Sequence, residues 1–382
     1  MRVTRNTRLK TAGEAGKIAA MPRSSSPALE FRAGPSALAR IRDEGLRPDM
    51  IRVIAGAAGG PKWLALNRLD RALFGDWLKD INQPVHLAGS SIGTWRFACA
   101  AQRDPVAAIE RFEAAYVNEQ RYSRKPPSLE ITAVTERLLD VLLGEHGAEE
   151  ILAHPVFRMN IMTVRSRRAL ESEDRRRLAL GMLGAGAANL ASRKALRLFF
   201  ERALFHDPRE VPPYVRYLND MPLHRMPLSP RNLRSALLAS ASIPGYMLGV
   251  TDIIGAPPGI YRDGGLIDYH MALPWGVEEG IVLFPHFGRK VLPGWFDKLA
   301  PWRRARGRAL DHVLLLQPSR AWLASLPGGH IPDRHDFMRY AGRDDEREAA
   351  WRRAVAAGQQ LADEFMEAVE SGRIRQQVKL LR

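Results

Sequence analysis

The chain has 382 residues, of which 46% are hydrophobic, enough for one large α/β domain or two smaller domains. Its single cysteine, Cys99, excludes an intramolecular disulfide framework and argues against a cysteine-based zinc site. The formal net charge of +15 favours anionic partners. The basic residues are spread along the chain without a zinc-finger or RNA-binding motif, so no nucleic acid is expected as a partner.

The sequence predicts three segments, namely a basic disordered arm over 1–28, a main domain over 29–343 and a C-terminal amphipathic helix over 344–382 packed on that domain. The arm lacks the apolar core of a secretory signal. No apolar run reaches the roughly 18 residues that a membrane-spanning helix needs. A cytoplasmic location is therefore expected.

Strands and helices are predicted to alternate along the first hundred residues of the main domain. A strand at 50–56 runs into a glycine loop, a helix covers 62–78, a second strand covers 84–89 and a second helix covers 92–102. Short connections between such elements indicate a parallel sheet covered on both faces. Later expectations are a mostly helical region at 105–205 with a strand at 155–166, strands at 280–285 and 312–317, and loops at 207–230 and 255–265.

Gly89, Ser91 and Gly93 fit the pattern G-x-S-x-G, the sharp strand-to-helix turn that exposes a serine hydroxyl above a sheet. The pattern selects Ser91 over Ser90, and the predicted strand and helix supply the required flanks. The two glycines allow a tight turn. The N–H of Ile92, at the start of the helix, can donate to a developing oxyanion. The alternative is a purely structural turn of small residues.

The stretch "AGAAGGPKW" directly follows the first of these strands and exposes backbone N–H groups at Gly59 and Gly60. Its spacing matches no dinucleotide fingerprint, and Trp63 follows Lys62 where a phosphate-binding loop needs Ser or Thr. An oxyanion hole one strand away from Ser91 remains. Lys62 is a candidate for attracting anionic substrates, and a loop-bracing lysine is an equal alternative.

Asp263 precedes Gly264 and Gly265 on a predicted crowded turn, and the upstream helix "LRSALLASASIPGYM" is expected to form a wall of the same pocket. Asp263 is the predicted base, although His270 follows in the chain order of α/β-hydrolase triads. An ordinary carboxylate is a weak base at neutral pH, so Asp263 requires desolvation or strong oxyanion stabilisation.

Two further stretches carry weaker signals. "HIPDRHD" at 330–336 clusters histidines and aspartates but matches no common metal site, so we predict a polar loop and no metal. "LPGWFDKLAPWRRARGR" places Trp295, Phe296, Leu299 and Trp302 beside arginines, a combination that suits a membrane interface. Peripheral contact with an anionic membrane is one expectation for this segment, and a buried lid is the other.

Over about residues 50–290 the chain resembles the patatin-like phospholipase family, whose Gly-rich oxyanion loop, G-x-S-x-G and D-G-G or D-G-A motifs occur here in order. The resemblance implies a three-layer α/β/α fold with a mostly parallel central sheet and a large helical insertion. It also implies a dyad of Ser91 and Asp263, lipid acyl hydrolysis, and no metal or cofactor. The chain departs from the family's loop pattern at Ala58 and Trp63, which puts the substrate in question.

The predicted function is hydrolysis of acyl esters, with a (phospho)lipid as the expected substrate. Two alternatives stay open, namely a soluble esterase or thioesterase, and a catalytically silent protein that binds lipid or nucleic acid on the same fold. The sequence indicates no oligomeric state, acyl length or head group.

Overall fold

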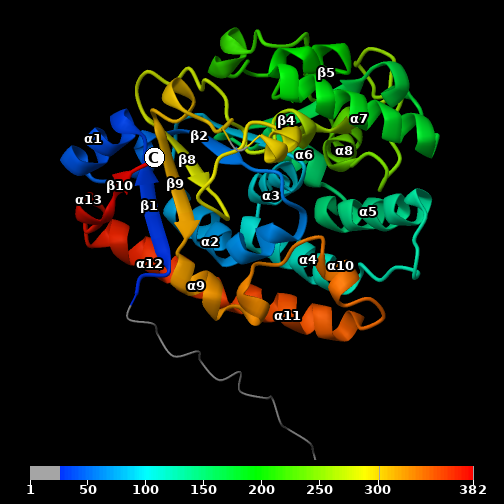
Figure 1. The fold of residues 1–382 in the computed structure, drawn as a ribbon. Helices are drawn as coiled ribbons and strands as arrows, with labels where there is room; N and C mark the ends of the chain where they lie inside the picture. The colour runs from blue at the N-terminus through cyan, green and yellow to red at the C-terminus, as the bar shows by residue number, and fades with distance from the viewer. Residues whose placement is uncertain (1–25, 301, 382) are drawn as a thin grey trace, which may run out of the picture.

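The computed structural model describes residues 26–300 and 302–381 as an α/β protein built around one ten-stranded sheet (Figure 1). The strands are β1 (Leu29–Ala33), β2 (Ile51–Gly56), β3 (Val85–Ser90), β4 (Phe157–Ser166), β5 (Phe200–His206), β6 (Leu223–Pro227), β7 (Tyr261–Asp263), β8 (Ile281–Pro285), β9 (Val313–Pro318) and β10 (Lys379–Leu380). The α-helices are α1 (Pro35–Glu44), α2 (Asn67–Ala72), α3 (Ile92–Ala100), α4 (Pro105–Asn118), α5 (Ser128–Leu143), α6 (Gly147–Ala153), α7 (Arg175–Ala191), α8 (Pro230–Ala241), α9 (Arg320–Ser325), α10 (Asp336–Arg339), α11 (Asp344–Ala357), α12 (Gln359–Glu370) and α13 (Ile374–Gln377). Within the described ranges, no helix combines the length and the apolar character needed to cross a bilayer.

The strand order is β10-β1-β9-β8-β2-β3-β4-β5-β6, and β7 pairs with β4. Six of these nine strand pairings are parallel, and only β1–β9, β4–β5 and β4–β7 are antiparallel. The mostly parallel α/β sheet predicted from the sequence is therefore confirmed. The strands expected near 84–89, 155–166, 280–285 and 312–317 correspond to β3, β4, β8 and β9.

The centre of the sheet is covered by α3, all of whose residues are buried. This helix packs against β2, β3 and β4, and α4, α5 and α8 pack around it. On α3, Arg96 makes a bidentate ion pair of 2.7 and 2.6 Å with Asp70 of α2. This pair satisfies both charges where water is excluded. Helices α3–α6 form the helical insertion between β3 and β4.

The helix predicted over 62–78 is not a single helix. The structure has a 3₁₀ segment η2 (Gly60–Leu66), then α2, then one wide turn η3 (Leu73–Trp77), closed by a 2.9 Å bond from the Leu78 N–H to the Leu73 carbonyl. The wide turn contains Gly75, where a Cβ would lie 2.4 Å from Val106 of α4. Close packing against α4 thus accompanies the change of helical pitch.

Three strands lie where the sequence predicted helix or loop. β5 was assigned to the helical region, and β6 and β7 to the loops at 207–230 and 255–265. The sequence of β5 does not have the apolar pattern of a buried strand, because it includes Arg202. This buried guanidinium binds Asp268 at 2.7 Å and Asp220 at 2.6 Å. β7 has three residues and owes its strand geometry to pairing with β4.

The C-terminal segment differs from the single helix predicted over 344–382. It forms α11, α12, α13 and β10, and β10 adds to the sheet beside β1. The chain changes helix at Gly358, where a Cβ would lie 3.0 Å from the Ala65 carbonyl oxygen. Glu364 of α12 accepts the N–H groups of Ala28 and Leu29.

Most of the predicted N-terminal arm lies outside the described residues. Of its described residues, Ala28 is buried in the domain and is therefore not part of an extended arm.

Candidate active site

Ser91 is the single residue between β3 and α3, with φ 53° and ψ −133°. A positive φ is costly for a residue with a side chain, and such strain is typical of functional turns. Close packing explains the two flanking glycines. A Cβ on Gly93 would lie 2.3 Å from the Gly56 carbonyl oxygen, and a Cβ on Gly89 would lie 2.9 Å from the carbonyl carbon of Gly93.

Strand β4 aligns the ends of two strands that approach it from opposite directions. On one edge of β4, β3 runs parallel and ends with Ser90 opposite Met162. Further along β4, β7 runs antiparallel and ends with Asp263 opposite Thr163. The two strand ends therefore meet at consecutive residues of β4. Gly264 is required at this junction because its Cβ would lie 2.1 Å from the Met162 carbonyl oxygen.

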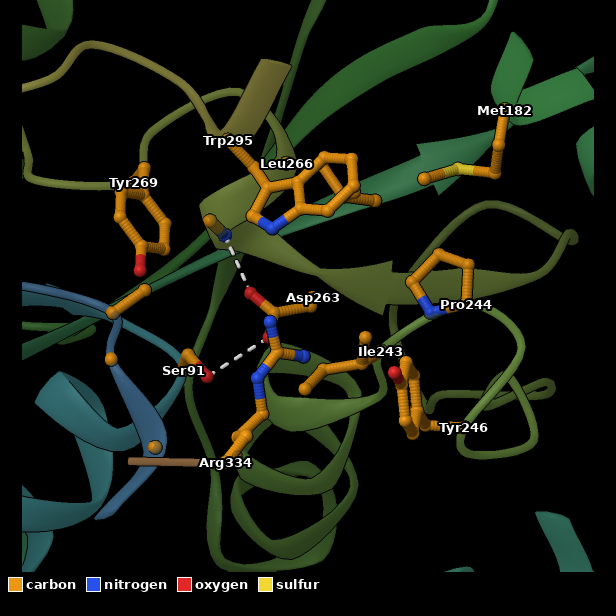
Figure 2. A pocket seen from close by; sticks show the side chains of 14 residues that line it. Ser91, Met182, Ile243, Pro244, Tyr246, Asp263, Leu266, Tyr269, Trp295 and Arg334 are labelled. Atoms are coloured by element: carbon orange, nitrogen blue, oxygen red, sulfur yellow. Dashed lines mark hydrogen bonds between the residues drawn. The ribbon is translucent and has the colours of Figure 1, made fainter. Parts of the chain in front are cut away.

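The side chains of Ser91 and Asp263 meet at this junction (Figure 2). The Ser91 hydroxyl donates a 2.9 Å hydrogen bond to Asp263 Oδ2, and the Gly265 N–H donates a 2.7 Å bond to Oδ1. Burial raises the pKa of Asp263 to about 6, although both hydrogen bonds and the charges of Arg334 and Lys298 act to lower it. The carboxylate is thus a stronger base than an exposed aspartate.

Residues Ala58, Gly59 and Gly60 of the glycine loop line the cavity above Ser91. The Ala58 N–H is occupied, since it donates to the Tyr269 carbonyl at 2.8 Å. Within the described residues the N–H groups of Gly59 and Gly60 have no hydrogen-bond acceptor. Ile92 provides the first N–H of α3, for which the helix itself has no acceptor. These three N–H groups are the candidate donors to an oxyanion at Ser91.

The glycine loop has tight backbone requirements of its own. Gly60 adopts φ 57°, a left-handed conformation that favours glycine. A Cβ on Gly59 would lie 2.7 Å from the Phe287 ring, so this ring supports the loop from below. Lys62 lies over the same ring, 5.0 Å from its centroid, and burial lowers the pKa of its ammonium. Lys62 is not among the residues that line the cavity. A role in substrate binding stays a prediction.

The cavity has a volume of about 140 Å³, and Ser91 and Asp263 lie in its wall (Figure 2). Aromatic and aliphatic side chains form most of the remaining wall, which suits an acyl chain. These side chains are Met182, Ile243, Pro244, Tyr246, Leu266, Tyr269 and Trp295.

Two cationic side chains near Asp263, Arg334 and Lys298, were not predicted as site residues from the sequence. Arg334 lines the cavity and lies 5.5 Å from the centroid of the Tyr246 ring, without an ion pair in the described residues. Lys298 Nζ lies 4.1 Å from the centroid of the Tyr269 ring. Partial burial and the charges of Lys62 and Arg334 lower the pKa of Lys298.

The signal for Arg334 was the segment 330–336, which the sequence marked as a polar loop or a metal site. Within the described residues no group of three or more His, Cys, Asp or Glu is placed to hold a metal ion. The segment instead supplies a guanidinium to the cavity.

Ser240, near the end of α8, was also missed. Its hydroxyl accepts a 2.8 Å hydrogen bond from the Ser91 N–H and donates a 2.7 Å bond to the Met162 carbonyl. This side chain therefore ties the turn at Ser91 to β4. The small-residue run "ASAS" was the available signal, since a small hydroxyl residue suits such a crowded position.

The structure places His270 away from the Ser91 hydroxyl. Its Nδ1 lies 3.0 Å from the Lys290 carbonyl oxygen and 3.1 Å from the Leu292 N–H, and its ring packs on His286. Burial, His286 and Lys62 hold the pKa of His270 well below the usual histidine value. A histidine of this kind is a poor proton acceptor.

No family model matches the chain, and no curated protein matches it. Among solved structures, the chain is similar to the human GIVD cytosolic phospholipase A2, with a TM-score of 0.39 and 12% identity. The similarity covers 89% of this chain and 63% of the phospholipase chain, so the chain spans less than two thirds of that protein. A likeness this weak carries no conclusion about activity or substrate.

Proposed function

We propose that the protein is a patatin-like serine acyl hydrolase that cleaves acyl esters through a dyad of Ser91 and Asp263. The observation that supports this most strongly is the 2.9 Å hydrogen bond from the Ser91 hydroxyl to the Asp263 carboxylate in the cavity wall. Burial brings the pKa of Asp263 to about 6, closer to the range in which a general base is effective at neutral pH.

In the proposed reaction, Asp263 takes the hydroxyl proton while Ser91 Oγ attacks the carbonyl carbon of the ester. The negative charge that develops on the carbonyl oxygen is stabilised by the N–H groups of Gly59, Gly60 and Ile92. When the tetrahedral species collapses, the bond to the alcohol oxygen breaks and that oxygen takes the proton from Asp263. A water molecule then gives a proton to Asp263 while its oxygen attacks the acyl carbon. The bond between Ser91 Oγ and the acyl carbon breaks, Oγ takes the proton back from Asp263, and the carboxylic acid is released.

The cavity supports a lipid-like but compact acyl group. Its volume of about 140 Å³ is close to the roughly 150 Å³ of a cavity that holds benzene, so it accommodates about six carbon atoms. A longer chain must extend beyond this volume. This size also favours the second candidate, a soluble esterase that acts on short acyl chains.

The charges around the cavity favour an anionic substrate. Arg334 presents a guanidinium that has no acidic partner in the described residues. A guanidinium binds carboxylate and phosphate groups in a bidentate manner. Burial and the charges of Lys62 and Arg334 lower the pKa of Lys298, beside Tyr269, to about 7, so this lysine adds a partial positive charge at neutral pH. An ester that carries a phosphate or a carboxylate near its alcohol fits this arrangement.

A hydrolysis screen tests the proposal. We expect the protein to cleave phosphatidylglycerol, a lysophospholipid or a p-nitrophenyl butyrate, and a preference for the butyrate over the palmitate ester would favour the soluble esterase. Ser91→Ala should abolish turnover, whereas Ser90→Ala should retain it because the Ser90 hydroxyl is bonded to the Asp268 carbonyl at 2.8 Å. Hydrolysis no faster than that of Ser91→Ala, from folded protein and for every ester, would reject the function.

A further inference from the structure

Helix α7 has an unusual outer face. Residues 178–191 contain no charged side chain, and three leucines on this helix are exposed, Leu180 by 67%, Leu183 by 70% and Leu190 by 45%. Their spacing of three and seven residues places them on one side of the helix. The opposite side of the helix, which includes Leu178 and Ala185, is buried against the rest of the protein. A surface helix normally presents polar residues to water, so an apolar outer face indicates an interaction surface.

Further exposed apolar side chains lie on the 3₁₀ segment η8 (Trp295–Leu299), which packs on α7, and at Trp302. Arg303 donates to the Asn189 carbonyl and, at 2.9 Å, to the Leu190 carbonyl, so it fixes the segment to the end of α7. Beyond this joint, Leu299 is 68% exposed and Trp302 is 63% exposed. We call the five side chains Leu180, Leu183, Leu190, Leu299 and Trp302 the apolar rim.

Two of the four residues expected at a membrane interface, Trp295 and Phe296, are not part of the rim. Phe296 is buried because its ring packs under α7, 6.1 Å from the centroid of Phe200, with Gly186 above it. Trp295 is partly buried and lines the cavity. The interfacial prediction was therefore wrong for Phe296, whereas Leu299 and Trp302 are exposed as that prediction requires.

The rim is built on the same two segments that supply residues to the cavity that contains Ser91. Met182, next to Leu183 in the chain, and Trp295, four residues before Leu299, both line that cavity (Figure 2). A surface held against the rim therefore contacts the two segments that form part of the cavity wall.

Basic side chains surround the rim. The exposed ones are Arg175, Arg176, Arg177, Lys194, Arg197, Arg304, Arg306 and Arg308. None of them forms an ion pair with an acid within the part of the chain that the structure describes. Of the acids near the start of α7, Asp174 accepts the Arg177 N–H at 2.9 Å as a helix cap, and Glu173 is bonded to Arg262 at 2.9 Å. Glu171 and the capping Asp174 are the remaining exposed acids beside these eight cations, so most of the positive charge around the rim remains uncompensated.

We propose that the apolar rim docks the protein onto an anionic lipid bilayer, with the leucines and Trp302 in the headgroup region and the arginines on the lipid phosphates. Aromatic and aliphatic side chains ringed by cations are the composition of a peripheral membrane surface. Uncompensated positive charge distinguishes this occupant from a second copy of the chain, which would bring an equal positive charge to the contact. The proposal extends the proposed function, because docking would present lipid esters to the cavity.

Binding to vesicles tests this surface without reference to catalysis. Ser91→Ala protein, which cannot degrade the lipid, is sedimented with vesicles of equal parts phosphatidylcholine and phosphatidylglycerol, and with vesicles of phosphatidylcholine alone. We expect binding to the anionic vesicles, a decrease of at least tenfold in the paired variant Leu180→Ser/Leu183→Ser, and unchanged binding in Leu380→Ser. Leu380 is 39% exposed on β10, at the opposite edge of the sheet.

Three outcomes would overturn the proposal. They are equal or absent binding of the parent protein to both vesicles, undiminished binding of the folded paired variant, and a lipid-free oligomer that the paired variant converts to monomers. The last outcome would show that a second copy covers the rim. Hydrolysis of a soluble ester by the paired variant in an otherwise wild-type chain is expected to be normal, since neither leucine lines the cavity. Failure of docking and failure of the proposed function are therefore distinguishable.

Discussion

The hydroxyl of Ser91 and the carboxylate of Asp263 are 2.9 Å apart although 172 residues separate them in the chain. β4 brings them together, because β3 and β7 end opposite its consecutive residues Met162 and Thr163. The geometry of the proposed dyad is thus a property of strand register.

Removal of His270 is expected to have a modest effect. Ser91→Ala and Asp263→Asn should abolish ester hydrolysis nearly completely. His270→Ala should lower kcat by less than about tenfold, since His270 does not line the cavity and the Ser91 hydroxyl is bonded to Asp263 instead. Turnover is compared after a folding check by circular dichroism. A thousandfold loss in His270→Ala, about 4 kcal/mol of barrier, would show that the base is the histidine.

The rate should depend on the protonation of Asp263. Since only the carboxylate form accepts the serine proton, kcat/KM is expected to rise with pH through about 6, the pKa to which burial raises this group. The charges of Arg334 and Lys298 lower that pKa. Arg334→Gln and Lys298→Met should therefore move the acidic limb to higher pH. A limb that stays in place in both variants would contradict the electrostatic coupling.

Asp263 should destabilise the folded protein at neutral pH. Its folded pKa of about 6 lies above the ordinary aspartate pKa of 3.8, so the folded state binds the proton more tightly than the unfolded state does. The stability that this proton contributes is present below pH 3.8 and is lost as the pH rises through 6. Asp263→Asn should raise the free energy of unfolding by up to about 3 kcal/mol at pH 8, and by much less at pH 4. Denaturant unfolding at pH 8 and pH 4 measures this difference. An equal change in the free energy of unfolding at the two pH values would contradict the destabilising effect of the ionised carboxylate.

Gly60→Val should lower turnover by at least tenfold. The residue has φ 57°, and a β-branched side chain there would shift the N–H groups assigned to the oxyanion. Gly307→Val is a matched control, because Gly307 has φ 58° and nothing within 4 Å of its Cβ position. Both variants carry the same backbone strain, so equal turnover in the two would place the oxyanion hole elsewhere.

Much of the candidate site is predictable from the sequence because its parts are local. The turn at Ser91 and the turn at Asp263 each combine a reactive side chain with glycines that close packing demands, and both leave a readable pattern. The rest depends on tertiary pairing. Arg334 and Ser240 reach the site from a loop and a helix whose sequences carry no comparable pattern. The strand β7 has three residues, too few to show an alternation.

The role of Ser240 follows from such pairing and can be tested separately. Ser240→Ala removes the acceptor of the Ser91 N–H, and an unsatisfied buried N–H costs about 1–3 kcal/mol. We expect a lower kcat with little change in KM, since the turn at Ser91 moves while the apolar side chains that line the cavity stay in place. Ser242→Ala is the control, because that hydroxyl binds only the Leu238 carbonyl, one turn earlier in the chain. Steady-state kinetics that show the same kcat for both variants would exclude a positioning role for Ser240.

Labelling with a fluorophosphonate probe tests the nucleophile and its activation most directly. The probe forms a covalent bond with an activated serine, and peptide mapping by mass spectrometry then identifies the modified residue. We predict that the adduct lies on Ser91 in the wild-type protein and that labelling is at least a hundredfold slower in folded Asp263→Asn. An adduct on another residue, or equally fast labelling of Ser91 in Asp263→Asn, would contradict the dyad of Ser91 and Asp263.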